Sequence, residues 1–389
     1  MVNAFQWAAS PALHFGVGKR DLIAPLAASF GERCLILLGG QSFVNSEYWP
    51  ILQQAFDEAK VQWQSHAITG EPSPQMIDSC VAQYRDWQPQ VVVAIGGGSV
   101  LDAGKAIAAM FTEIEGVKSY LEGVGESKPS GTTLPFIAVP TTSGTGSEAT
   151  KNAVLSEVGP NGFKKSLRHD SYVPNIAILD PELTRSVPPA VSMSSGMDAF
   201  TQLLEAYLSS KASPLSDALA LDGLRLISTC LPAVWEDGDN LNARAGMSYA
   251  AMLSGLCLAN AGLGLVHGFA SSIGGRIEIP HGLLCARLMA PVNQVTLAAI
   301  RERQAWSPAF AKYVQVGKLF HPQVGHRSDD FYADALIETI ASWTEKFGLA
   351  PIGAFGMAAD MVPEIVANTS QKNHPIQLTQ AEVASCLEG

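Results

Sequence analysis

The chain has 389 residues, of which 47% are hydrophobic and 16% charged, and its formal net charge is −11. This length exceeds what one hydrophobic core usually serves, so we expect two domains, and the hydrophobic fraction excludes a disordered chain. The acidic balance excludes the clustered lysine and arginine of a nucleic-acid-binding protein, but it is compatible with an anionic small molecule, because a local pocket can be positive.

Four short apolar runs in the first part of the chain each end at glycine or proline. They occupy residues 34–38, 91–95, 136–139 and 176–179. Because helical sequence lies between them, the runs predict buried parallel strands of a Rossmann-like α/β domain over residues 1–183.

A glycine-rich turn, Gly96–Lys105, follows the second run and opens a helix. Glycines let the backbone approach an anion, the N–H groups at a helix start point toward it, and Ser99 adds a hydroxyl donor. The alternative is a tight strand-to-helix turn without a ligand, since the turn is not the G-x-G-x-x-G dinucleotide fingerprint.

A second polar loop, Pro140–Thr150, follows the third run and is dense in hydroxyl groups and glycines. By itself this loop is compatible with a capped helix start. Two such loops, each placed after a strand, favour a nucleotide site more strongly than either loop alone.

The second part of the chain carries helical spacing, and strand-like runs become scarce. The clearest helical segments are residues 199–208, 216–228, 243–259 and 330–347. They predict an all-α domain over residues 184–389, joined to the first domain by a hinge at residues 181–189.

A carboxylate and two imidazoles in this helical part form a candidate metal site. Asp198 and Gln202 are four residues apart and therefore share one helix face, and His267 and His281 lie further along the chain. Asp and His are suitable ligands for a divalent transition metal. Taken alone, His267 in its apolar context is also compatible with a hydrogen-bonded core histidine.

The six cysteines form no C-x-x-C pair, and most lie beside apolar residues, where cysteine behaves as a small hydrophobe. A disulfide framework is therefore not expected, and a reducing compartment fits better. No basic segment followed by an apolar stretch opens the chain, and no uninterrupted apolar run approaches about 18 residues. We expect a cytoplasmic protein with no membrane partner.

Five motifs occur in an order that resembles the iron-containing (group III) alcohol dehydrogenases, and the resemblance covers nearly the whole chain. The motifs are Gly96–Lys105, Thr141–Glu148, Gly196–Ala199, Asn260–His267 and Pro280–Gly282. The resemblance implies a two-domain enzyme of dehydroquinate-synthase-like fold, with cofactor and metal meeting in the interdomain cleft.

The resemblance also assigns roles position by position. It implies that Asp198, His267 and His281 bind the metal and form the catalytic centre. The cofactor positions that it implies are Gly97, Gly98 and Ser99 at the pyrophosphate, Asp102 near the nicotinamide, Thr141, Thr142 and Thr145 on the nucleotide, and Lys164 as a further cofactor contact.

Two positions depart from the family pattern. The fourth metal ligand of the family is usually a histidine, where this chain has Gln202, which can ligate more weakly through its amide oxygen. A second histidine that usually follows the first by one turn is replaced by Ser271. These departures leave open whether the metal is Fe²⁺ or Zn²⁺, whether metal dependence is kept, and whether protons travel through water, a ribose hydroxyl or Ser271.

The expected reaction is metal-dependent, NAD(P)-linked hydride transfer between nicotinamide and a small alcohol or aldehyde. The turn after the first strand, with Gly40 and Ser42, has no acidic residue to repel a 2′-phosphate, and it resembles family members that accept NADPH. NADP(H) is therefore favoured over NAD(H). We also expect a homodimer. The alternatives are a dehydroquinate-synthase-like lyase that uses NAD catalytically and a nucleotide-binding protein that has lost activity.

Overall fold

The computed structural model describes residues 4–304 and 306–388. The chain forms two compact units. An α/β unit comprises Ala8–Glu157 and Lys164–Val187. A helical unit comprises Val158–Phe163, the described residues from Pro188 onward and the described residues before Ala8. The sequence places the domain boundary at residue 183, and the chain leaves the α/β unit at Val187, within the predicted hinge.

Six parallel strands form the sheet of the α/β unit, in the order β1-β8-β5-β4-β2-β3. Their bounds are β1 Ala12–Phe15, β2 Arg33–Gly39, β3 Gln62–Ile68, β4 Val91–Gly96, β5 Phe136–Pro140 and β8 Ile176–Leu179. The four predicted runs form β2, β4, β5 and β8, so the predicted parallel sheet is confirmed. The edge strands β1 and β3 have mostly exposed or half-buried side chains, and for this reason they lack the continuous apolar run that identifies a buried strand.

The strand order reverses between β2 and β4. From β2 the chain continues to β3 on one side, and it then crosses to β4 on the other side of β2. Ligands of open parallel sheets bind beyond the carboxyl ends of the strands at such a reversal. The turn at Gly39–Ser42 and the glycine-rich turn at Gly96–Ser99 follow these two strands.

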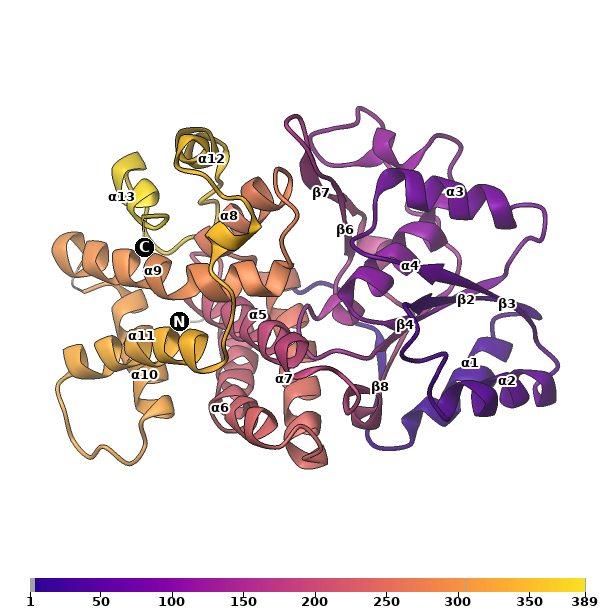
Figure 1. Ribbon diagram of the computed structural model, residues 1–389, viewed down its shortest axis with the longest axis horizontal. Coiled ribbons are helices and arrows are strands. Elements are labelled where there is room, and N and C mark those ends of the chain that lie inside the picture. Colours follow the sequence, from indigo (N-terminus) through magenta and orange to yellow (C-terminus); the bar gives the residue numbers. More distant parts are fainter. Residues whose placement is uncertain (1–3, 305, 389) are drawn as a thin grey trace. The chain divides into compact units, whose positions relative to one another are not determined.

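Four helices and a small second sheet complete the α/β unit (Figure 1). The helices are α1 Ile23–Ala28, α2 Tyr48–Glu58, α3 Pro74–Tyr84 and α4 Gly98–Met110, and the second sheet pairs β6 Asn152–Glu157 with β7 Phe163–Arg168. Helix α4 is buried along almost its whole length, since it packs against β4, β5 and β6. Its position fixes the glycine-rich turn at the carboxyl edge of the sheet.

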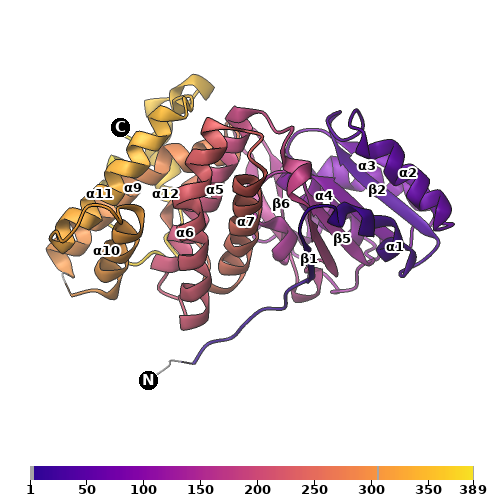
Figure 2. The same ribbon diagram turned by 90° about the horizontal axis from the view of Figure 1, so that it is seen from below.

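The helical unit contains nine α-helices among the described residues. They are α5 Pro189–Leu208, α6 Pro214–Glu236, α7 Leu241–Ala261, α8 Leu265–Gly274, α9 His281–Arg303, α10 Pro308–Phe320, α11 Asp329–Lys346, α12 Val362–Asn368 and α13 Gln380–Ser385. Helices α5, α6 and α7 pack side by side (Figure 2), and α9 packs on α5, α8 and α11. The predicted helical segments lie in α5, α6, α7 and α11, which confirms the helical second domain.

Two of these helices, α6 and α9, are long and apolar enough to cross a membrane by length and composition, and the bent pair α7 and α8 passes the same test together. Within the helical unit, α6 packs against α5, α7 and α10, and α9 packs against α5, α8, α10, α11 and α13. Apolar residues around a helix are expected where several neighbours cover it. Packing inside the unit buries 61% of the apolar window of α9 and 33% of that of α6.

Candidate functional site

Three helices of the helical unit bring the predicted metal ligands together. Asp198 lies in the middle of α5, His267 lies in the first turn of α8, and His281 is the first residue of α9. Gly282 allows the close approach of α9 to α5, because a Cβ at this position would lie 2.5 Å from the backbone oxygen of Ser194. A larger residue here would force the two ligand-bearing helices apart.

The ligand atoms converge on one point, and Cys285 joins the three predicted residues. His267 Nε2 and His281 Nε2 lie 3.4 Å and 3.7 Å from Asp198 Oδ1. Cys285 Sγ lies 3.7 Å from each of these two imidazole nitrogens. The four ligand atoms all lie within 4.8 Å of one another.

This arrangement fits a divalent metal. Metal–ligand distances of about 2.0–2.3 Å in a tetrahedral site place the ligand atoms roughly 3.3–3.6 Å apart, close to the four separations of 3.4–3.7 Å given above. Asp198 is only 1% exposed, and its Oδ1 has no hydrogen-bond partner among the described residues. Because a buried carboxylate oxygen without a hydrogen bond is costly, a cation at the cluster would satisfy it.

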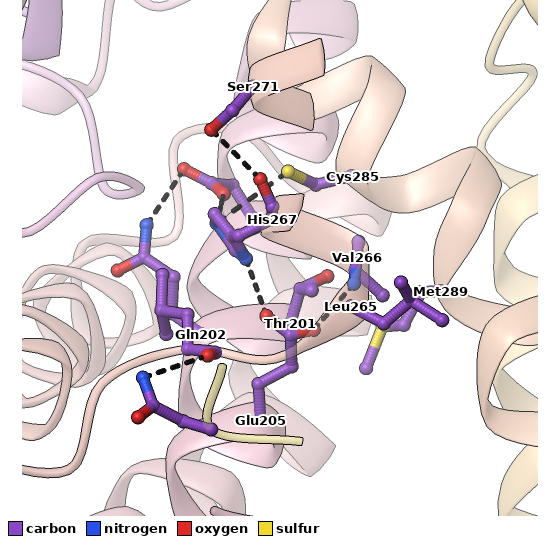
Figure 3. A network of polar contacts seen from close by, with 12 residues as sticks. Thr201, Gln202, Glu205, Leu265, Val266, His267, Ser271, Cys285 and Met289 are labelled. Carbon is purple, nitrogen blue, oxygen red and sulfur yellow. Dashed lines mark hydrogen bonds and ion pairs between the residues drawn. The ribbon is translucent and has the colours of Figure 1, made fainter. Parts of the chain in front are cut away.

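Glu205 holds His267 from the opposite side. His267 Nδ1 donates to Glu205 Oε2 at 2.7 Å, and the backbone N–H of Val266 donates to Glu205 Oε1 at 2.7 Å (Figure 3). This contact directs Nε2 of His267 at the cluster, as in the histidine–carboxylate pairs of metal sites. Burial lowers the pKa of His267, but Cys285, Asp198 and Glu205 outweigh burial and raise this pKa well above its usual value.

Gln202 contacts Asp198 through its amide nitrogen. Gln202 Nε2 donates to Asp198 Oδ2 at 3.1 Å (Figure 3), and Gln202 Oε1 accepts from the Ser254 hydroxyl at 3.0 Å. Ser271 is exposed, and its hydroxyl donates to the backbone oxygen of His267 at 3.1 Å. The ligand role of Gln202 and the proton-relay role of Ser271 stay predictions.

Cys285 is the residue that reasoning from the sequence missed. From the sequence, Cys285 is interpreted like the other cysteines as a small hydrophobe, and in the structure its side chain is buried. The available signal is its spacing, because a residue four positions after His281 lies on the same face of α9. Burial raises the pKa of the Cys285 thiol to about 11, although His267 opposes this shift.

In the α/β unit, the two predicted nucleotide loops lie in contact. They follow the neighbouring strands β4 and β5, and the backbone N–H of Thr141 donates to the oxygen of Gly96 at 2.9 Å. A Cβ at Gly98 would lie 2.4 Å from the side chain of Thr145, and one at Gly97 would lie 3.2 Å from Thr142. Glycine is therefore required for this close approach of the two loops.

The first turn of α4 offers backbone donors beside these loops. Its N-cap, Gly97, has no side chain to occupy the free N–H groups, and Gly98 and Ser99 follow it as half-buried residues. Such a helix start binds anions because its N–H groups are unpaired and the helix dipole favours negative charge. The pyrophosphate role of Gly97, Gly98 and Ser99 and the nucleotide role of the threonines stay predictions.

Asp102 and Lys105 lie on α4 beneath the second loop and hold that loop in place. Asp102 accepts from the hydroxyl of Ser147 and from the backbone N–H of Val154. Lys105 Nζ donates to oxygens of Ser147, Thr150 and Asn152 at 2.7–3.1 Å. Burial lowers the pKa of Lys105 to about 8, against the opposing effect of Asp102. The predicted position of Asp102 near the nicotinamide stays a prediction beside this structural role.

The remaining predicted cofactor residues also lie in the α/β unit. Lys164 Nζ lies 2.6 Å from Glu71 Oε1 and is largely buried. Gly40 has a φ of +52°, a left-handed conformation that favours glycine, and Gly40 and Ser42 are exposed after β2. Residues 40–46 contain no charged side chain. The turn therefore presents amide and hydroxyl groups alone at the reversal of strand order.

Glu148 in the second loop makes a testable contribution to stability. It is 3% exposed, and burial raises its pKa from 4.5 to about 7, with its own backbone N–H and Lys105 opposing the shift. The folded state then holds an extra proton between these pH values. The protonation of Glu148 therefore contributes fully to the free energy of unfolding below pH 4.5, and this contribution is lost as the pH rises through 7. We expect Glu148→Gln, which mimics the protonated form, to match the parent near pH 4.5 and to be roughly 3 kcal/mol more stable near pH 8.

Urea unfolding across this pH range measures the effect of Glu148→Gln. Glu157→Gln is the matched control, since Glu157 is an exposed carboxylate paired with Lys118, and its pair is expected to contribute at most about 1 kcal/mol. A stability difference between Glu148→Gln and the parent that does not change with pH would contradict the prediction.

Comparison with known proteins agrees with this arrangement. The sequence model described as iron-containing alcohol dehydrogenase matches residues 10–181, and that of the C-terminal part of the Fe-containing alcohol dehydrogenase family matches residues 192–388. The chain belongs to the iron-containing alcohol dehydrogenase family. Members of the family bind a divalent metal and nicotinamide dinucleotide, and the family resemblance found in the sequence is confirmed.

Individual relatives are similar to this chain over most of their length. The chain is 38% identical to the probable alcohol dehydrogenase EutG of Salmonella typhimurium over 286 residues, which cover 73% of this chain and 68% of EutG. It is 36% identical to long-chain-alcohol dehydrogenase 1 of Geobacillus thermodenitrificans, covering 97% of this chain and 94% of that protein. The fold matches the crystal structure of a 1,3-propanediol oxidoreductase with a TM-score of 0.88 and 25% identity, over 99% of both chains.

A second solved structure is that of sulfoacetaldehyde reductase from Bifidobacterium kashiwanohense in complex with NAD⁺. It has a TM-score of 0.81 and 27% identity, and the match covers 99% of this chain and 98% of that one. The fold of an α/β domain followed by a helical domain is therefore shared over the full length of these proteins.

Proposed function

We propose that the protein is a metal-dependent, NAD(P)-linked alcohol dehydrogenase that acts as an aldehyde reductase on small substrates. The observation that carries the proposal is the convergence of Asp198, His267 and His281 on one point of the helical unit, in a chain of this family. When bound, the metal supplies a Lewis acid that polarises a carbonyl group, and the nicotinamide supplies or accepts the hydride.

The residues of this chain have defined tasks in that reaction. Asp198, His267 and His281 hold the metal, and Glu205 keeps the Nε2 lone pair of His267 directed at it. The backbone N–H groups at the start of α4 bind the pyrophosphate, while Lys105 keeps the second loop against that helix. Rigid placement of both reactants is what the protein contributes to the rate.

The names of the relatives support a proposal for the substrate class. EutG is named a probable alcohol dehydrogenase, PduQ of Salmonella typhimurium is named a 1-propanol dehydrogenase, and the Geobacillus protein is named for long-chain alcohols. We therefore propose an aliphatic alcohol or its aldehyde as the substrate. A cytoplasmic location agrees with the free thiols of all six cysteines. The homodimer is a further proposal, and light scattering of the purified protein tests it.

A metal analysis combined with an aldehyde screen tests the proposal. Purified protein is expected to hold about one Fe²⁺ or Zn²⁺ per chain and to oxidise added NADPH or NADH with short aldehydes. Removal of the metal by a chelator is expected to stop turnover, and readdition is expected to restore it. Cofactor binding without turnover on any aldehyde would support a protein that has lost activity. Conversion of a substrate without net turnover of the nicotinamide would support the lyase.

The cofactor preference is a separate prediction. We expect NADPH to be preferred over NADH, because the turn after β2 has no acidic residue to repel a 2′-phosphate. Gln41→Asp is expected to shift the ratio of kcat/KM values toward NADH by about 10-fold through repulsion of the phosphate. Gln41→Asn is the matched control, since it has the shape of aspartate without its charge. A parent enzyme with a higher kcat/KM for NADH would refute the preference.

A further inference from the structure

The structure places a cysteine where the metal cluster has room for a fourth ligand, and it turns the amide oxygen of Gln202 away from that cluster. We propose that the Cys285 thiolate is the fourth protein ligand of the metal, and that Gln202 is a positioning residue for Asp198. This proposal rests on the metal of the proposed function. It predicts a ligand set of one carboxylate, two imidazoles and one thiolate, which favours Zn²⁺ over Fe²⁺ and leaves the carbonyl group of the proposed reaction to bind as a fifth ligand, an expansion that zinc sites allow.

The position of the sulfur supports Cys285 as a ligand. Cys285 Sγ is equidistant, at 3.7 Å, from His267 Nε2 and His281 Nε2, the two nitrogens that also approach Asp198 Oδ1. In a tetrahedral site with metal–sulfur and metal–nitrogen distances of about 2.3 Å and 2.0 Å, sulfur and nitrogen lie roughly 3.5 Å apart. The sulfur therefore occupies a ligand position that needs little adjustment of α9.

The orientation of Gln202 supports its role as a positioning residue. Its Nε2 donates to Asp198 Oδ2 (Figure 3), and its Oε1 accepts from Ser254. The assignment of nitrogen and oxygen follows from chemistry, since an inverted amide would place its oxygen against a carboxylate oxygen. Gln202 is 2% exposed, so water does not screen this repulsion. The amide therefore binds one oxygen of Asp198 and leaves the other, Oδ1, for the metal.

The chemistry of the thiolate determines which metal the site prefers. A thiolate is a soft ligand that selects zinc over harder ions, and for nitrogen, oxygen and sulfur sites the affinity for Zn²⁺ generally exceeds that for Fe²⁺. Replacing a histidine ligand by Cys285 therefore moves the site toward zinc. The thiolate also compensates for the weak ligand at position 202, so the departure from the family pattern does not by itself remove the metal.

Cobalt substitution reports directly on a metal–thiolate bond. Metal-free protein is loaded with one equivalent of Co²⁺ without oxygen, and its absorption spectrum is recorded. We expect a near-ultraviolet sulfur-to-cobalt charge-transfer band in the parent protein. The band is expected to disappear in Cys285→Ser and to persist in Gln202→Ala. Cys257→Ser is the matched control, because Cys257 is a buried cysteine of the same unit whose thiol donates to the backbone oxygen of Ser216.

Zinc affinity, measured by competition with a chelator, gives the second readout. Gln202→Ala is expected to weaken zinc binding about 10-fold, which is the size of effect of removing an outer partner of a metal ligand. Cys285→Ser is expected to weaken zinc binding by more than the roughly 100-fold upper end of that range. Cys257→Ser is expected to bind zinc as the parent does. If Cys285→Ser does not fold, Cys285→Ala replaces it, since alanine adds no polar atom to the buried position.

The outcomes separate this inference from the proposed function. Bound Co²⁺ without a thiolate band, in a protein that reduces aldehydes, would overturn the role of Cys285 and leave the function intact. Loss of cobalt binding in Gln202→Ala together with retention in Cys285→Ser would assign the fourth ligand to Gln202 instead. Full reductase activity in protein that binds neither Co²⁺ nor Zn²⁺ would overturn the metal of the proposed function itself.

Discussion

Replacing His267 or His281 by alanine is expected to lower kcat/KM by about 10³-fold and to reduce bound metal well below one equivalent. Polarisation of a carbonyl group by a metal is worth several kcal/mol of transition-state stabilisation, and each 1.36 kcal/mol is a factor of ten in rate. Each histidine supplies an Nε2 within 3.7 Å of Asp198 Oδ1, and no other histidine belongs to the described cluster. No neighbouring histidine is therefore expected to replace the lost imidazole ligand in either variant.

The measurement combines steady-state kinetics with metal analysis of each variant. His326→Ala is a suitable control, because His326 is exposed between α10 and α11 in the same unit. It is expected to keep the metal content and activity of the parent. Full activity in metal-stripped His281→Ala would show that the reaction proceeds without the metal, and it would remove the basis of the proposed function.

Lys105→Met is expected to lower the free energy of unfolding by about 3–5 kcal/mol, the range measured when one partner of a buried ion pair is removed. Lys105 is 2% exposed, lies 3.8 Å from Asp102 and donates to oxygens of the second nucleotide loop. Methionine keeps most of the volume but leaves these acceptors and Asp102 without the ammonium group. We therefore expect the loop to loosen and cofactor affinity to fall together with stability.

Urea unfolding and cofactor titration at the same pH test this prediction. Lys151→Met is the matched control, because Lys151 pairs with the exposed carboxylate of Asp170 and such a pair contributes about 0–1 kcal/mol. Equal stability of the two variants would show that Lys105 does not hold the loop, even though its ammonium group is surrounded by acceptors.

The sequence by itself determined the features that depend on local pattern. The strands β2, β4, β5 and β8 are short apolar runs bounded by glycine or proline, so both faces must be buried and the parallel sheet follows. The two polar loops after β4 and β5, and the motifs that contain Asp198, His267 and His281, are contiguous stretches of chain. Each of these features is recognisable without knowledge of what lies beside it in space.

Only the tertiary structure decided the features that depend on contacts between distant segments. The edge strand β1 has no buried face of its own, and it is defined by pairing with β8, more than 150 residues later. The orientation of Gln202 depends on Ser254 of α7, and the tethering of the second loop depends on a lysine of α4. Cys285 resembles any buried cysteine in the sequence, because the atoms that distinguish it, the imidazole nitrogens of His267 and His281, reach it through the packing of α8 on α9. A ligand set is a property of side-chain directions at one point, and those directions are fixed when the helices pack.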